Sequence, residues 1–176
     1  KLILQWEFLS YNKEEFQSAA DVDNERYKAT PLGKRVAELY LDPMTAYTLI
    51  GGMKRAREKT LSSFTLVHLI CAQLELRPLL SVKVKEYERV EEELMKRASD
   101  LLINESTQYD TEYDEFLKSI KTAMFFEFWM NEATEEELLK EFDVRPGELH
   151  AKKERADWLL YSAVELAKLL QFRDLE

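Results

Sequence analysis

The segment from Arg145 to Phe172 constrains the fold most, because its apolar residues recur with the period of one long α-helix. At about 100° per residue, six of them fall on one face, as expected for a helix that packs on a bundle. These six residues are Leu149, Ala156, Leu160, Ala163, Val164 and Ala167. The 4 Gly and 4 Pro of the chain leave little room for the turns of an all-β protein. The sequence therefore predicts an all-α fold.

Trp158 lies about 160° from Leu160 around the same helix, away from the predicted apolar face. It shares its side of the helix with Ala151, Arg155 and Ser162. A tryptophan that lies beside a guanidinium and away from the core is suited to stacking on a nucleic-acid base. The same pattern is expected if the helix is central in its bundle and Trp158 packs on a second neighbour. The helical pattern alone leaves both interpretations open and favours the packing one.

The remaining sequence predicts further helices and one strand from apolar spacing and capping residues. Thr30 before Pro31 is typical of a helix start, and Thr134 to Glu137 form a capping box. The expected helices span about 1–11, 32–41, 43–57, 64–74, 87–103, 110–131, 135–142 and 145–172, and the expected strand spans 25–30. We therefore expect an irregular bundle of six or seven helices after Pro43. A truncated winged-helix-like segment with one short strand precedes it.

Several apolar groups are expected to point into the core. They are Val36, Leu39 and Tyr40; Met44, Tyr47, Leu49, Ile50 and Met53; and Met124, Phe125, Phe126, Phe128, Trp129 and Met130. The helix over 64–74 is apolar on most sides and is expected to be central. His68 on it is predicted to be a hydrogen-bonded core residue, and Cys71 a buried inert thiol. Gly51 and Gly52 predict a close approach of two helices.

The charge balance limits which partners the chain can bind by itself. Its net charge is −9 at pH 7, whereas nucleic-acid binders that act alone usually carry a basic excess. This balance argues against strong DNA binding by the chain alone, but it allows a small contact surface inside a larger protein. The single cysteine excludes an internal disulfide and agrees with a cytoplasmic location. No stretch of the sequence approaches the roughly 18 apolar residues of a membrane span. The start at Lys1 is interpreted as that of a fragment or a processed chain.

Sequence motifs for catalysis are absent. The chain has no GxxxxGK[ST] phosphate loop, no GxGxxG after a strand and no GxSxG elbow. Two histidines, His68 and His150, and one cysteine give little support for a zinc site or a Cys–His dyad. The carboxylates, including the run from Glu86 to Glu93, fall on charged helix faces that we expect to be solvated. We therefore expect no catalysis, no metal and no cofactor in this chain itself.

Four sets of runs, taken in order, carry a resemblance to a known family. They are 27–43; 64–71 with 77–79; 121–129 with 131–132 and 135–139; and 146–149 with 156–162. Together they cover nearly the whole chain and resemble the archaeal superfamily-two DNA repair helicases called Holliday-junction-migration helicases. The joint order of the runs is much more specific than any single run.

The resemblance implies two parts, with residues 1–42 ending a winged-helix domain and residues 43–176 forming a helical ratchet domain. It also implies that two ATP-hydrolysing motor domains, with ATP and magnesium, lie outside this chain, and that a terminal helix-loop-helix domain is missing after Glu176. In such helicases the helical domain closes a ring around single-stranded DNA. Its long ratchet helix stacks a tryptophan on a base and places a basic residue nearby. Trp158 matches that tryptophan.

One position departs from the family pattern. The companion arginine of the family lies about two turns before the tryptophan, and that position is Ala151 here. Arg155 shares the face of Trp158 and is the first candidate to replace it, followed by His150 and Lys152. The expected partners are single-stranded or branched DNA and the motor domains of the same polypeptide. No membrane is expected, and the fragment is expected to be monomeric.

Two other interpretations remain open at this point. An acidic helical scaffold that docks another protein would also fit the composition. An accessory domain of an RNA helicase would fit as well, because base stacking does not distinguish RNA from DNA without contacts to the 2′-hydroxyl.

Overall fold

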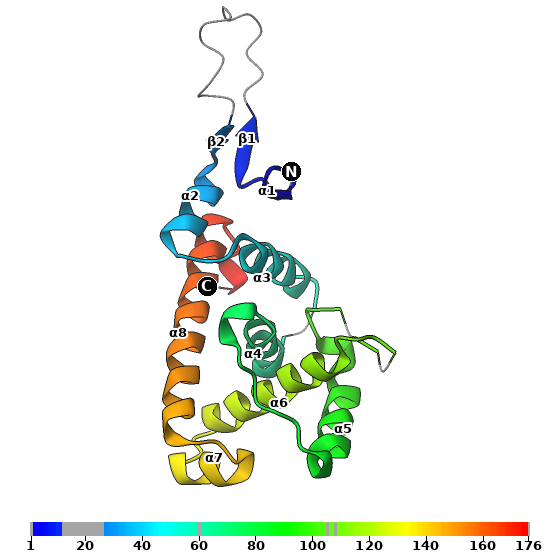
Figure 1. Cartoon of the computed structure of the whole chain (residues 1–176). Coiled ribbons are helices and arrows are strands. Elements are labelled where there is room, and N and C mark those ends of the chain that lie inside the picture. The colour runs from blue at the N-terminus through cyan, green and yellow to red at the C-terminus, as the bar shows by residue number, and fades with distance from the viewer. Residues whose placement is uncertain (1, 12–26, 60, 105, 108, 176) are drawn as a thin grey trace, which may run out of the picture. The chain divides into compact units, whose positions relative to one another are not determined.

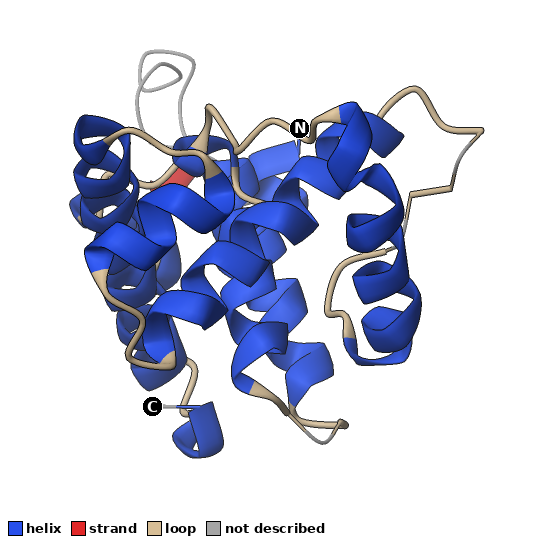
Figure 2. Cartoon of the chain, turned by 90° about the horizontal axis from the view of Figure 1, so that it is seen from below, coloured by secondary structure: helices blue, strands red, loops and turns tan. Residues whose placement is uncertain are grey.

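The computed structural model describes residues 2–11, 27–59, 61–104, 106–107 and 109–175. These residues form eight α-helices and one two-stranded sheet (Figure 1), and Figure 2 shows how strongly helix dominates. The first elements are α1 (Leu2–Gln5), β1 (Leu9–Tyr11), β2 (Tyr27–Ala29), α2 (Pro31–Glu38) and α3 (Pro43–Ala56). They are followed by α4 (Ser63–Cys71), α5 (Tyr87–Arg97), α6 (Tyr113–Met130), α7 (Glu135–Phe142) and α8 (Pro146–Leu169). The predicted mostly helical fold with a short strand segment is confirmed.

The described residues divide into two compact units. The first includes the chain up to Ile50 and from Ser162 onward, and the second spans Gly51–Tyr161. Helices α3 and α8 therefore each contribute residues to both units. The domain boundary expected after residue 42 stays a prediction.

In the first unit, a short hairpin leads into α2. Strands β1 and β2 are antiparallel, with Leu9 opposite Ala29. Thr30 follows β2 and caps α2, because its Oγ1 accepts a hydrogen bond of 3.0 Å from the Gly33 amide. The helix expected over residues 1–11 is wrong for its second half, since residues 9–11 pair with β2 instead. The strand expected over 25–30 is confirmed for 27–29, and residues 25 and 26 lie outside the described residues.

Some residues of the first unit expected in the core lie at the surface. Val36, Leu39 and Leu49 are buried as expected, but Tyr40 is 88% exposed. Tyr40 takes a left-handed backbone conformation (φ 57°) in the turn after α2, so the period of the helix no longer orients its side chain. Met44 and Tyr47 are also exposed; the Tyr47 ring stacks on Trp6, with ring centroids 4.9 Å apart.

In the second unit, α4 is central, as predicted. Ser62 caps it by accepting a hydrogen bond of 3.2 Å from the Thr65 amide, and seven of its nine residues are buried. Helix α4 packs chiefly on α6, and α5 packs on α6 as well. Gly52 of α3 faces α4 at close range, because a Cβ added there would lie 2.5 Å from Cδ1 of Leu69. The predicted close helix approach is confirmed at Gly52.

The helix boundaries follow the local capping signals. Thr134 and Glu137 form the predicted capping box of α7, and Asp143 ends that helix in a left-handed conformation. Helix α5 ends at Arg97, earlier than the expected residue 103, because the chain leaves the helical path to bury Leu101 and Leu102.

The expected core of α6 is correct for its centre and wrong for its end. Met124, Phe125 and Phe126 are buried, whereas Phe128 and Met130 are exposed. The end of α6 therefore has a solvent face, and a continuous apolar run cannot reveal such a face.

The two adjacent glycines of α3 offer a matched test of the helix contact. We expect Gly52→Ala to lower the free energy of unfolding by about 1–3 kcal/mol, because the buried Leu69 must move to admit the methyl group. Gly51→Ala is expected to raise it by about 0.5–1 kcal/mol. Its Cβ would meet nothing nearer than the Arg55 side chain at 3.5 Å, and alanine favours a helix interior. Urea denaturation of both variants measures the difference, and equal effects would contradict the close approach.

Candidate nucleic-acid interface

Helix α8 carries every residue predicted to contact nucleic acid. Its buried face therefore decides which of these residues remain accessible to a nucleic acid. Its buried residues are Leu149, Lys152, Ala156, Leu159, Ser162, Leu166 and Ala167. The predicted apolar face is wrong at Leu160, which is 42% exposed, while Leu159 is completely buried. The reason is that the buried face includes two polar residues, Lys152 and Ser162. The centre of this face is therefore rotated around the helix away from Leu160.

Trp158 lies at the edge of this buried face. It follows from helical geometry that its side chain lies about 100° from Leu159 and about 60° from Arg155. The residue is half-buried and interacts with its own protein. The ring is therefore neither fully enclosed in the core nor fully surrounded by solvent.

Arg155 is exposed, but its guanidinium is held in place. One of its terminal nitrogens, Nη1, donates a hydrogen bond to the backbone carbonyl of Arg77. A guanidinium carries five N–H donors, so one contact to a neutral carbonyl leaves its charge unpaired and several donors for another acceptor. The pairing of Arg155 with Trp158 on one side of α8 stays a prediction from helical geometry.

The other predicted site residues have different surroundings. Lys152 is 2% exposed, its Nζ donates to the Pro78 carbonyl, and it lies 3.4 Å from Oε1 of Glu148. Burial lowers the pKa of Lys152. Ser162 is completely buried, Ala151 is half-buried and His150 is exposed. Of the three candidate basic residues, Arg155 and His150 are exposed, whereas Lys152 is enclosed.

An irregular segment supports α8, and sequence reasoning missed it. The carbonyls of Arg77 and Pro78 accept from α8, and the Ser81 carbonyl accepts a hydrogen bond of 2.8 Å from Lys121 of α6. Lys121, which is 4% exposed, also forms an ion pair of 2.8 Å with Glu86. The available signal was the presence of two lysines on helix faces that are otherwise apolar. We call residues 77–86 the strap.

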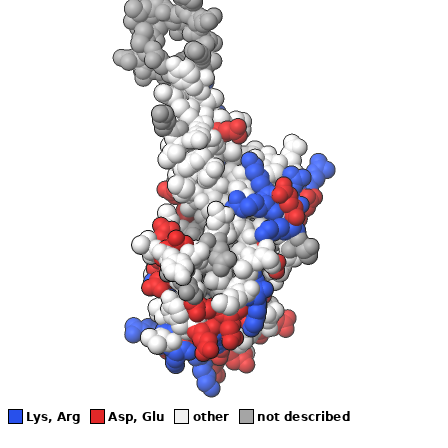
Figure 3. All heavy atoms as spheres, turned by 90° about the vertical axis from the view of Figure 1, so that its right-hand side faces the viewer, with Lys and Arg blue, Asp and Glu red and all other residues white. Residues whose placement is uncertain are grey.

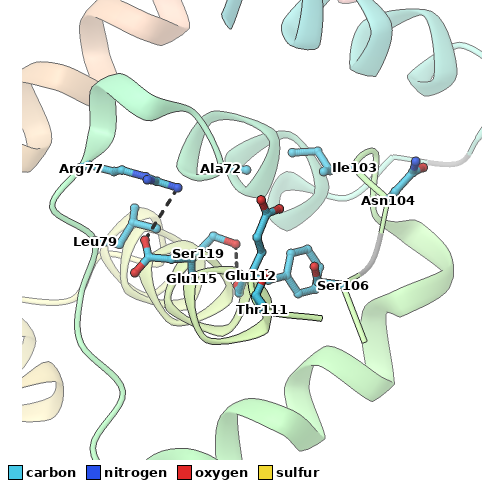
Figure 4. Close-up of a pocket in the computed structure, with 11 residues that line it drawn as sticks. Ala72, Arg77, Leu79, Ile103, Asn104, Ser106, Thr111, Glu112, Glu115 and Ser119 are labelled. Atoms are coloured by element: carbon cyan, nitrogen blue, oxygen red, sulfur yellow. Dashed lines mark hydrogen bonds and ion pairs between the residues drawn. The ribbon is translucent and has the colours of Figure 1, made fainter. Parts of the chain in front are cut away.

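A pocket of about 340 Å³ opens between the strap and α6 (Figure 4). Arg77 and Glu115 face each other across it at 3.7 Å, and Ser119 lies in its wall. Ser119 Oγ donates to the Phe116 carbonyl at 2.6 Å and lies 3.0 Å from Nε2 of His68.

The pairing of Ser119 with His68 is structural. Because the Ser119 proton is directed to Phe116, Nε2 of His68 is the donor, and its Nδ1 is buried without a hydrogen-bond partner. Burial lowers the pKa of His68 to about 4, so the ring is neutral near pH 7. The prediction of a hydrogen-bonded core histidine is confirmed. Burial also raises the pKa of the Cys71 thiol, as expected for an inert cysteine.

The described part of the chain was also searched for a metal site and for a membrane-spanning helix. Within it, no three His, Cys, Asp or Glu side chains come together in a way that could hold a metal ion. Among the described helices, none is both long and apolar enough to cross a membrane.

The contact between Lys152 and the strap can be tested by stability measurements. We expect Lys152→Met to lower the free energy of unfolding by about 1–3 kcal/mol, because methionine retains most of the apolar stem but leaves the Pro78 carbonyl without its donor. The control is Lys140→Met, which changes an exposed lysine of α7 and should stay within about 0.5 kcal/mol. Urea denaturation measures both, and a Lys152→Met chain as stable as the unmodified one would contradict this role.

Comparisons with known proteins show which family the chain resembles. The model of the family described as archaeal helicase, domain 4, matches residues 64–176. The chain is also similar to proteins named ATP-dependent DNA helicase Hel308. It is 33% identical over 146 residues to that of Methanocella arvoryzae, 35% over 158 residues to that of Methanococcus vannielii and 36% over 149 residues to that of Pyrococcus horikoshii.

These alignments cover 81%, 86% and 85% of the chain and 20% of each relative. The chain therefore spans about a fifth of the length of the curated relatives it matches. The resemblance inferred from the sequence runs is confirmed. Because the matched region extends over well more than half of the sequence, the chain belongs to the archaeal helicase domain 4 family.

Proposed function

We propose that this chain is the part of an ATP-dependent DNA helicase that grips single-stranded DNA while the motor domains advance. The relatives it matches are named as DNA helicases that depend on ATP. In this proposal ATP and magnesium act in motor domains of the same polypeptide, which lie outside this chain. The chain contributes a contact that resists backward movement of the strand.

Trp158 is the residue proposed to make that contact. The observation that carries the proposal is that the indole lies half-buried at the edge of the buried face of α8. A partly buried ring loses less conformational freedom when a base stacks on it than a fully exposed ring would lose. Such stacking contributes about 1–3 kcal/mol per base and tolerates any base, as an unwinding enzyme requires.

Arg155 is proposed as the basic companion of Trp158. Position 155 lies about 60° around the helix from position 158, and the guanidinium, which donates a hydrogen bond to the Arg77 carbonyl, keeps donors with which to bind a phosphate or a base edge. His150 is a second candidate because it is exposed, whereas Lys152 and Ser162 are assigned to the internal support of α8. Ala151, at the position of the family's usual arginine, contributes no charge.

The net charge of −9 agrees with a chain that stacks on a base while the motor domains supply most of the affinity for DNA. Neutralisation of phosphates supplies much of the affinity of proteins for DNA, and an acidic domain supplies little of it. Stacking adds a contact that does not depend on net charge. We therefore assign most of the affinity to the motor domains and the resistance to backsliding to α8.

Replacing Trp158 in the complete helicase polypeptide tests the proposal. We expect Trp158→Ala to lower the amount of forked duplex unwound per ATP hydrolysed by about tenfold, because a stacking energy of about 1–3 kcal/mol is lost. DNA-stimulated ATP hydrolysis should be largely retained. Trp158→Phe should recover part of the unwinding, because phenylalanine can still stack.

The matched control is Leu160→Ala, which removes an exposed apolar side chain of the same helix. It should leave unwinding unchanged. If Trp158→Ala also leaves unwinding per ATP unchanged, the ratchet role is excluded, and a helical protein-interaction module becomes the better account. If unwinding of RNA duplexes depends on Trp158 while that of DNA does not, an accessory domain of an RNA helicase is favoured instead.

A further inference from the structure

A second pocket lies between the strap and α6, beside the one described above. Its volume is about 440 Å³, and it shares Arg77, Leu79 and Glu115 with that neighbour, whose lining is drawn in Figure 4. Its other lining residues are Pro78, Ser81 and Lys118. We call these six residues the strap pocket. All six belong to the second compact unit.

Two of the three charged residues that line the strap pocket are cations, in a chain whose surface is rich in carboxylates (Figure 3). The one carboxylate, Glu115, accepts a hydrogen bond of 2.5 Å from Nζ of Lys118. Its other oxygen lies 3.7 Å from Nη2 of Arg77, which is too far for a hydrogen bond. One carboxylate does not neutralise two cations, so the lining carries one positive charge in excess.

A guanidinium of α8 contacts the strap at the same residue. Arg155 donates to the backbone carbonyl of Arg77 and forms no ion pair with any residue in the described part of the chain. The adjoining pocket adds one carboxylate, Glu112, to the charged residues already named. These two added charges cancel, so the excess of one positive charge remains.

A structural role accounts for only part of the strap pocket. Glu115 and Lys118 lie three residues apart on α6, and such pairs are common on helix surfaces. Arg77 comes from the strap instead, is exposed, and approaches Glu115 without a hydrogen bond. The hydroxyl of Ser81, also exposed, has no hydrogen-bond partner among the described residues. A guanidinium and a hydroxyl therefore line the pocket with their donors unused.

These donors fit a phosphate group. Guanidinium and ammonium groups bind phosphate oxygens through charge-assisted hydrogen bonds, and serine hydroxyls also donate to the phosphates of nucleic acids. A phosphodiester carries one negative charge, which equals the excess charge of the lining. The pocket therefore matches a single phosphate of a nucleic-acid backbone in both charge and donors.

We propose that the strap pocket binds one backbone phosphate of the single-stranded DNA whose base stacks on Trp158. The inference rests on the proposed function, but it assigns a different surface and a different chemistry. Arg77 and Ser81 donate to the phosphate, and Lys118 turns from Glu115 toward it. Arg155, one turn from Trp158 and bonded to the Arg77 carbonyl, connects the two contacts. Binding in the strap pocket is independent of base sequence and sensitive to salt.

An abasic strand separates the phosphate contact from base stacking. The whole 176-residue chain is titrated at low salt with dT8 and with an abasic oligonucleotide that has the same phosphates and no bases. We expect both probes to shift the backbone amide NMR signals of Leu79 and Ser81. Only dT8 should shift the indole signal of Trp158. If dT8 moves the strap signals but not the indole signal, the strap pocket is retained and stacking is rejected.

Replacing the competing carboxylate gives the sharpest variant. Glu115→Gln retains the size of the side chain but releases Arg77 and Lys118 from the carboxylate. We expect it to raise the affinity for the abasic strand about two- to fivefold, as the loss of one exposed charge interaction allows. The control Glu136→Gln changes an exposed carboxylate of α7, gives the same net charge and should leave the affinity unchanged.

Removing both cations should have the opposite effect. In the double variant Arg77→Gln, Lys118→Gln, the slope of log affinity for dT8 against log salt should become shallower by about 0.7, because one phosphate contact is lost. The Arg77 carbonyl that Arg155 binds is retained in this variant. The control Arg145→Gln, Lys140→Gln removes two other exposed cations and should leave the slope unchanged.

Three results would overturn the proposal. They are unshifted strap signals with both probes, equal slope changes in the two double variants, and a Glu115→Gln chain that binds no more tightly than the Glu136→Gln chain. Unchanged thermal unfolding of each variant excludes misfolding as the cause. The titration of the unmodified chain tests the proposal independently of any variant.

Discussion

The arrangement of the candidate site depends on the contacts that the buried ammonium group of Lys152 makes. A lysine with 2% exposure is unfavourable unless its donors are satisfied, and here the Pro78 carbonyl and Glu148 provide that compensation. The contact fixes the strap against α8 from inside. One turn further along the helix, Arg155 binds the adjacent Arg77 carbonyl from outside. Two adjacent carbonyls of the strap are therefore bound by two cations of α8, one buried and one exposed.

Much of the fold was predictable because its signals are local. The caps of α2 and α7 lie within three residues of the amides they bind, so Thr30 and Thr134 could be identified from the sequence. Strand β1 was not predictable in the same way. Residues 9–11 adopt it through pairing with residues 27–29, and apolar spacing in one short segment contains no information about that partner.

The candidate site was predictable in part for a related reason. Helical geometry alone places Arg155 and Trp158 on one side of α8. It cannot show that Lys152 and Ser162 belong to the buried face, because burial of a polar residue depends on acceptors elsewhere in the chain. The error at Leu160 and the failure to identify the strap have this single cause.

Base stacking is a contact that even an acidic chain can make, because it does not depend on net charge. The contact that we propose for Trp158 is therefore compatible with the charge of −9. It also does not read base sequence, since every base has a face on which an aromatic ring can stack.

The central claim is that a DNA base lies against the indole of Trp158. The chain has three tryptophans, so its indole N–H groups give three NMR signals at most. The signal that is lost in the Trp158→Phe variant is that of Trp158. On addition of single-stranded DNA, the account predicts that the Trp158 signal shifts while those of Trp6 and Trp129 stay in place. A Trp158 signal that does not move when the chain is saturated with DNA would contradict it.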